Sequence, residues 1–157
     1  MCTKHIIEVN NQNLHGSFSK DYQPILTIHS GDSVQFKTTD IDWGYSSKDG
    51  KRVLYDSREK EPFWGHPIIG PIAIKNASPG MTLEIKINDI VPGWYGWNSA
   101  GGKRNWQNLQ LGISEQDELS LDWLLDLEKN RGICHNKNKS FSVKLSPFMG
   151  IMSTAPS

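Results

Sequence analysis

The stretch Leu83-Glu84-Ile85-Lys86-Ile87-Asn88 alternates strictly between apolar and polar residues. Successive side chains of a β-strand point to opposite faces, so this period of two places the leucine and both isoleucines on one face. The acidic, basic and amide side chains then share the other face. We therefore predict a strand over residues 83–88, with its apolar face toward the core.

The same period of two recurs in shorter runs that glycine and proline separate. The sequence has 14 Gly and 8 Pro among its 157 residues, and they punctuate it at short intervals. Further strands are predicted over residues 25–28, 33–38, 68–74 and 141–145, the third interrupted by Gly70-Pro71. Many short strands between turn residues predict a mainly β fold. We expect a short-stranded sandwich or barrel with little helix, in one domain over residues 1–157.

Residues 114–130 carry two competing patterns. Three leucines recur at helical spacing, Leu121, Leu124 and Leu125. Ser114 would cap such a helix. Leu119 and Trp123, however, alternate with Leu121 as in a strand. The residue pattern alone slightly favours the helix.

Composition excludes several classes of partner. The chain has 17 Lys+Arg against 17 Asp+Glu, so its formal net charge is zero, whereas a nucleic-acid-binding protein would concentrate basic residues. No apolar run approaches the roughly 18 residues of a membrane span. The N-terminus carries charge almost at once and lacks the apolar region of a secretory signal. We predict a cytoplasmic protein whose two cysteines are reduced.

Two carboxylates directly follow the predicted strand 33–38, in Thr39-Asp40-Ile41-Asp42-Trp43-Gly44. Asp40 and Asp42 are two residues apart, so a continued strand would point both to one side. They could then bind a metal ion or act as an acid and a base. The alternative is a solvated loop with an Asx turn.

A histidine held between glycine and proline is the second candidate, in Trp64-Gly65-His66-Pro67. Its backbone is constrained while its ring stays free, which suits a metal ligand or a proton shuttle. A ring hydrogen-bonded to a backbone carbonyl is the equally favoured alternative. His15 is a weaker candidate. Trp97 belongs to an aromatic, glycine-rich stretch that could stack on a ligand or cap a core.

The order of these motifs is more specific than any single one. The groups that carry it are His15-Gly16-Ser17-Phe18, Pro24-Ile25-Leu26-Thr27-Ile28, Ser30-Gly31-Asp32-Ser33-Val34, Thr39-Asp40-Ile41-Asp42-Trp43, His66-Pro67-Ile68-Ile69-Gly70-Pro71-Ile72-Ala73-Ile74, Ala77-Ser78-Pro79-Gly80-Met81-Thr82-Leu83-Glu84-Ile85, Trp94-Tyr95-Gly96-Trp97 and Pro147-Phe148-Met149-Gly150. On these motifs, which span nearly the whole chain, the sequence resembles the acetamidase/formamidase family of linear-amide hydrolases.

The resemblance implies a β-rich fold and hydrolysis of a small amide, such as formamide or acetamide, to a carboxylate and ammonia. It also implies a strand over residues 123–127. Asp40 and His66 fall where the family places polar pocket residues, so they are the predicted catalytic residues. With Asp42, where the family more often has a small residue, they are also the predicted ligands of a divalent metal, with zinc as first choice. The predicted substrate-binding residues are His15, Trp43 and Trp97.

Family members continue through a Gly-Gly-Asn-x-Asp motif, whereas the sequence given ends at Ser157. The resemblance therefore implies a partial, N-terminal member. One alternative is a non-catalytic binding or oligomerisation domain with its interaction surface around Trp97. Another is a chain that does not fold alone, whose open strand edges invite aggregation or pairing with another chain. A homo-oligomer is among the expected assemblies.

Overall fold

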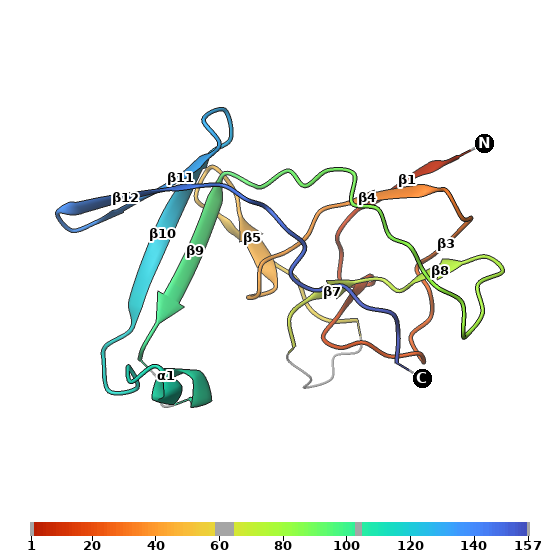
Figure 1. Ribbon diagram of the computed structural model, residues 1–157, viewed down its shortest axis with the longest axis horizontal. Coiled ribbons are helices and arrows are strands. Elements are labelled where there is room, and N and C mark those ends of the chain that lie inside the picture. Colours follow the sequence, from red (N-terminus) through yellow and green to blue (C-terminus); the bar gives the residue numbers. More distant parts are fainter. Residues whose placement is uncertain (1, 59–64, 103–104, 157) are drawn as a thin grey trace. The chain divides into compact units, whose positions relative to one another are not determined.

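The computed structural model describes residues 2–58, 65–102 and 105–156. The chain forms two compact units. The first comprises Met1–Lys86 with Gly150–Ser157, and the second Ile87–Met149. Figure 1 shows the ribbon coloured along the sequence, with most of its strands labelled.

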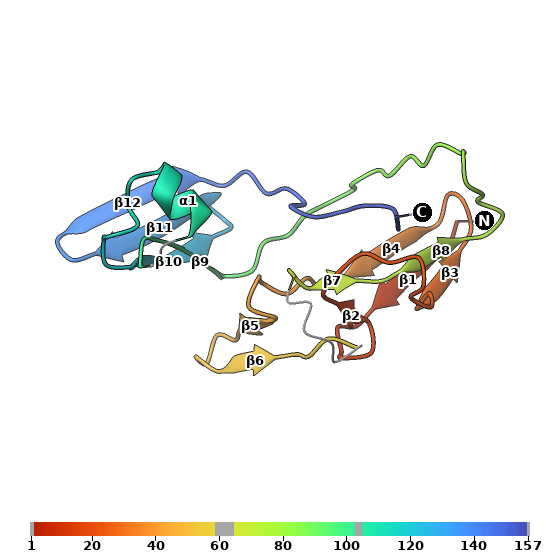
Figure 2. The ribbon, with the colours of Figure 1, turned by 90° about the horizontal axis from the view of Figure 1, so that it is seen from below.

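The first unit is built from pairs of short strands (Figure 2). Two pairs are parallel: β1 (Lys4–Ile7) with β4 (Ser33–Phe36), and β3 (Leu26–Ile28) with β8 (Ile72–Ile74). Two are antiparallel: β2 (Leu14–His15) with β7 (Ile68–Ile69), and β5 (Gly44–Ser46) with β6 (Arg52–Leu54). Gly70-Pro71 separates β7 from β8, so neighbouring stretches of chain pair with different strands.

The second unit is a four-stranded antiparallel sheet in the order β12-β11-β10-β9. Its strands are β9 (Tyr95–Ala100), β10 (Leu119–Asp126), β11 (Arg131–Asn136) and β12 (Lys139–Lys144). The helix α1 (Trp106–Gln110) begins at Asn105, whose side chain accepts a hydrogen bond from the backbone nitrogen of Asn108 at 2.8 Å. In the part of the chain that the structure describes, no helix is long and apolar enough to cross a membrane.

The mainly β fold with little helix is confirmed, as are the strands predicted near residues 25–28, 33–38, 68–74 and 141–145. The helix favoured by pattern within 114–130 is wrong, because residues 119–126 form β10, as the family resemblance implied. Leu121, Trp123 and Leu125 lie on one face of β10 and are half-buried, while Asp122 points to the opposite, exposed face. Strand β10 pairs with β9 on one side and with β11 on the other. This pairing decided the conformation against the local helical preference that the spacing of the leucines indicates.

The strand predicted over residues 83–88 is not formed. Leu83, Ile85 and Ile87 are 44%, 51% and 46% exposed. Among the described residues, no strand lies in register beside this segment. A period of two predicts which side chains share a face, but a strand also needs a partner for its backbone groups.

The buried side chains are few. Within residues 2–58, 65–102 and 105–156, the buried apolar residues are Leu14, Trp43 and Cys134. Leu14 and His15 of β2 are buried in the first unit, and Trp43 immediately precedes β5. The thiol of Cys134 is buried in the second unit and that of Cys2 is exposed in the first, and both are free.

Candidate functional site

The loop between β4 and β5 is organised by the side chain of Asp40. One carboxylate oxygen, Oδ1, accepts hydrogen bonds from the backbone nitrogens of Asp42 at 3.0 Å and Gly44 at 3.3 Å. The backbone nitrogen of Trp43 donates to the carbonyl oxygen of Asp40 at 3.1 Å. This is the Asx turn considered from the sequence, and it sets the direction in which the next residues point.

Arg52 of β6 holds the same carboxylate from the other side. Its guanidinium donates to both oxygens of Asp40, at 2.7 Å for the Nη2–Oδ1 pair, and also to the carbonyl of Asp42 at 3.3 Å. Burial raises the pKa of Asp40, but the hydrogen bonds and charge of Arg52, together with the backbone donors, outweigh it and leave the pKa lowered. Asp40 is therefore a stable carboxylate that fastens the loop to β6.

Trp43 lies at the end of this loop, immediately before β5. It is 8% exposed and has φ 60°, a left-handed conformation that a bulky side chain adopts only when its surroundings impose it. The indole nitrogen donates to the carbonyl oxygen of Gly65 at 3.1 Å. The Asp40 turn and this hydrogen bond together hold the ring in place.

Two glycines allow the close approaches around the indole. A Cβ on Gly44 would lie 2.1 Å from the carbonyl oxygen of Val53. A Cβ on Gly65 would lie 2.1 Å from the carbonyl oxygen of Gly16. Both distances are far below van der Waals contact, so each backbone approach requires glycine. The His15-Gly16 and Gly65-His66 motifs are thus brought together through their main chains.

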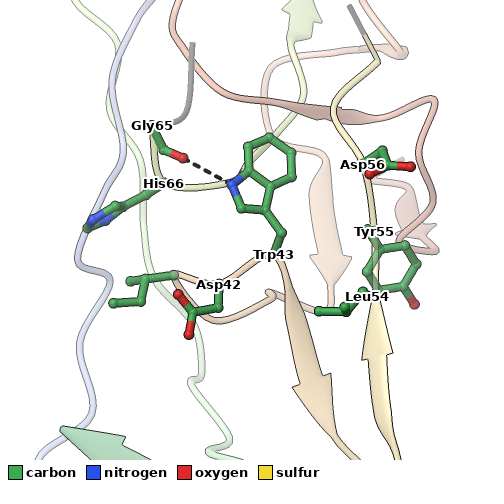
Figure 3. Close-up of a pocket in the computed structure, with 8 residues that line it drawn as sticks. Asp42, Trp43, Leu54, Tyr55, Asp56, Gly65 and His66 are labelled. Atoms are coloured by element: carbon green, nitrogen blue, oxygen red, sulfur yellow. Dashed lines mark hydrogen bonds between the residues drawn. The ribbon is translucent and has the colours of Figure 1, made fainter. Parts of the chain in front are cut away.

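A pocket of about 490 Å³ surrounds one side of Trp43 (Figure 3). Its lining residues are Ile41, Asp42, Trp43, Leu54, Tyr55, Asp56, Gly65 and His66. In the view of Figure 3, Asp42 and His66 lie to one side of the indole, and Tyr55 and Asp56 to the other. The pocket therefore combines an apolar wall with two carboxylates and an imidazole.

Three of the residues predicted from the sequence line this pocket, namely Asp42, Trp43 and His66. Asp40 does not line the pocket. Its carboxylate accepts a hydrogen bond from the backbone of Asp42, in the loop that carries the lining residues. His15 is 2% exposed, and its ring stacks on Tyr22 with centroids 4.2 Å apart. Trp97 belongs to the second unit, where it is half-buried in β9 opposite Asp122.

Tyr55 and Asp56 are lining residues that the sequence reasoning missed. They follow β6, and the backbone nitrogen of Tyr55 donates to the carbonyl oxygen of Trp43 at 2.8 Å. Burial, followed by the neighbouring Tyr45, raises the pKa of the Tyr55 phenol, which favours its neutral form. The sequence around Asp56 offers one hint, because this carboxylate lies two residues after the short alternating run 52–54. No recognisable motif includes it.

The metal ligands predicted from the sequence are Asp40, Asp42 and His66. Both oxygens of the Asp40 carboxylate are engaged by Arg52. Among the residues that the structure describes, no three His, Cys, Asp or Glu side chains gather in a way that could hold a metal ion. Zinc binding therefore stays a prediction.

Two comparisons with known proteins give a match. The model of the acetamidase/formamidase family matches residues 2–157. The crystal structure of an acetamidase from Bacillus halodurans is similar, with 25% sequence identity and a TM-score of 0.68. The match covers 96% of this chain and 46% of that one, so this chain spans about half the length of the acetamidase. Among curated proteins, none matches. The family match extends over nearly every residue, and the chain belongs to the acetamidase/formamidase family.

Proposed function

We propose that this chain binds a small linear amide, such as formamide or acetamide, in the Trp43 pocket and takes part in hydrolysis of its carbon–nitrogen bond. One observation carries the proposal: three of the site residues predicted from the family resemblance, Asp42, Trp43 and His66, line one pocket. The family match over residues 2–157 supports it. The similarity to an acetamidase supports the same reaction class. A formal net charge of zero suits a small neutral substrate.

The proposed chemistry uses the side chains of the pocket. Attack of water on the amide carbonyl forms a carbon–oxygen bond, and loss of ammonia breaks the carbon–nitrogen bond. Asp42 or Asp56 would accept the proton of the attacking water, and His66 would donate a proton to the departing nitrogen. The indole of Trp43 would exclude bulk water from one wall, which strengthens these electrostatic interactions.

Asp40 is proposed as a positioning residue. Its carboxylate contacts Arg52 and the backbone of its own loop, and that loop presents Asp42 and Trp43 to the pocket. This role does not require Asp40 to touch substrate. It differs from the catalytic and metal-binding roles predicted from the sequence, which no contact described above supports.

The test is ammonia release from formamide and acetamide by the purified chain, with and without added zinc. We expect His66→Asn to lower the rate roughly 100-fold or more, the usual effect of removing a general acid. His29→Asn is the matched control, because His29 is exposed and lies outside the pocket. An unmodified chain that releases no ammonia under any of these conditions would overturn the proposal. Equal rates for both variants would remove His66 from the reaction.

A further inference from the structure

The segment with the strongest strand pattern, residues 83–88, pairs with no strand among the residues that the structure describes. Between residues 82 and 93, and within the described part of the chain, no backbone group forms a hydrogen bond with another backbone group. Residues 81–89 are all exposed, including the three apolar residues of the alternating run. Figures 1 and 2 show the segment as the plain coil between β8 and β9.

An alternating segment with unused hydrogen-bonding groups is a template for another strand. Such a partner must satisfy the backbone and match the side chains on both faces. A second copy of the same segment meets both requirements. When two copies run antiparallel about Ile85, Glu84 of each copy lies directly opposite Lys86 of the other. In the same register Leu83 faces Ile87, Ile85 faces its own equivalent, and Thr82 faces Asn88.

We propose that residues 82–88 are an interaction surface for a second copy of this chain, paired as antiparallel strands about a two-fold axis through Ile85. An interface about a two-fold axis requires self-complementarity, and this register provides it on both faces. The polar face carries two opposite-charge pairs, and the apolar face places leucine and isoleucine side chains against each other. This inference concerns a different part of the chain from the Trp43 pocket and does not depend on the proposed function.

The register identifies the charge reversals that test it. In Glu84→Lys both charged positions become basic, and in Lys86→Glu both become acidic. Each change replaces two attractive cross-strand pairs by two repulsive ones, so we expect the dimer of either variant to dissociate at least roughly tenfold more readily. The double variant Glu84→Lys/Lys86→Glu restores both attractive pairs and should dimerise like the unmodified chain.

Mixing the two single variants gives a sharper result. In a mixed pair every basic position faces an acidic one, so equimolar Glu84→Lys and Lys86→Glu should form a heterodimer that neither forms alone. Analytical ultracentrifugation over a range of concentrations measures all five samples. The controls Glu128→Lys and Lys20→Glu carry the same changes of net charge at exposed positions outside the segment, and should dimerise normally.

The unmodified protein provides an independent measurement. Hydrogen exchange of the amides in residues 82–88 should slow as the protein concentration rises, because pairing gives these groups hydrogen-bond acceptors. A chain that stays monomeric at high concentration overturns the proposal, as would pairing only with a different polypeptide. A dimer that both single reversals leave intact overturns it too, because the interface then lies elsewhere.

Discussion

The indole nitrogen of Trp43 donates a hydrogen bond to the carbonyl oxygen of Gly65, with 3.1 Å between the two atoms. This bond joins the loop after β4 to the segment that carries His66. Its two residues, Trp43 and Gly65, are 22 positions apart in the sequence. Both segments line the same pocket. The position of the imidazole relative to the apolar wall therefore depends on one side-chain-to-backbone contact and on the glycine that allows it.

Replacing Gly65 by alanine should destabilise the first unit and lower amide hydrolysis. The new Cβ would lie 2.1 Å from the carbonyl oxygen of Gly16, so one of the two main chains must move. Overpacking of this kind costs about 1–3 kcal/mol. Urea unfolding measures the loss. Gly93→Ala is the matched control, since a Cβ there meets nothing within 4 Å. Equal stability of the two variants would contradict the close approach.

Replacing Asp40 by asparagine should loosen the loop that carries Trp43. The change keeps the size of the side chain but removes the charge that Arg52 binds. We expect a loss of about 1–2 kcal/mol in the free energy of unfolding, since hydrogen bonds to charged groups exceed those between neutral groups. If Asp40 only positions the loop, the pH at which hydrolysis is half-maximal should stay constant while the rate falls.

The control for Asp40 lies in the same hairpin. Asp49 pairs with Lys51 at 3.2 Å, with both side chains more than half exposed. Asp49→Asn should therefore change neither stability nor activity measurably. A shift of the pH profile in Asp40→Asn, absent from the control, would instead indicate that Asp40 itself exchanges a proton during the reaction.

Stability at acid pH should depend on Asp32, which ties the N-terminal strand to β4. The backbone nitrogens of Thr3 and His29 donate to its carboxylate at 2.8 and 3.0 Å, and these bonds, with the side chain of His5, lower its pKa from 3.8 to about 2. The unfolded chain binds the proton at higher pH than the folded one. The stabilisation is therefore complete above the ordinary aspartate pKa and is lost as the pH falls toward 2.

Unfolding measured between pH 5 and pH 2 tests this assignment. The unmodified chain should lose stability over roughly the interval between the two pKa values, and Asp32→Asn should show a shallower dependence. Asp21→Asn, at an exposed position outside these contacts, should keep the unmodified slope. Parallel curves for Asp32→Asn and the unmodified chain would show that the carboxylate contributes no pH-dependent stability.

Prediction from the sequence was most successful for alternating runs that also have a strand to pair with. The runs around Val34 and Phe141 form strands because each has a neighbouring strand to pair with. In residues 119–126, three leucines at helical spacing suggested a helix, yet the chain lies between β9 and β11 as a strand. Spacing reports a local preference, and sheet neighbours distant in sequence override it.

The candidate site was predicted only in part, for a related reason. Asp42, Trp43 and His66 stood out by their residue types and the turns beside them, and they share a pocket. Tyr55 and Asp56 reach it because the backbone of Tyr55 pairs with Trp43, which no local motif reveals. Asp40 was predicted to be catalytic from the family resemblance, and only the structure shows that its carboxylate contacts Arg52 and the backbone of its own turn.

The sequence by itself determined the mainly β character of this protein and the family to which it belongs, because alternation and motif order are properties of the linear chain. Only the tertiary structure decided which backbone groups meet. It placed Asp40 beside Arg52 and directed the indole nitrogen of Trp43 to the carbonyl oxygen of Gly65. Within the described part of the chain, it gave residues 83–88 no strand partner. The physical reason is that a period of two assigns side chains to faces, while hydrogen-bond partners come from segments that the period does not specify.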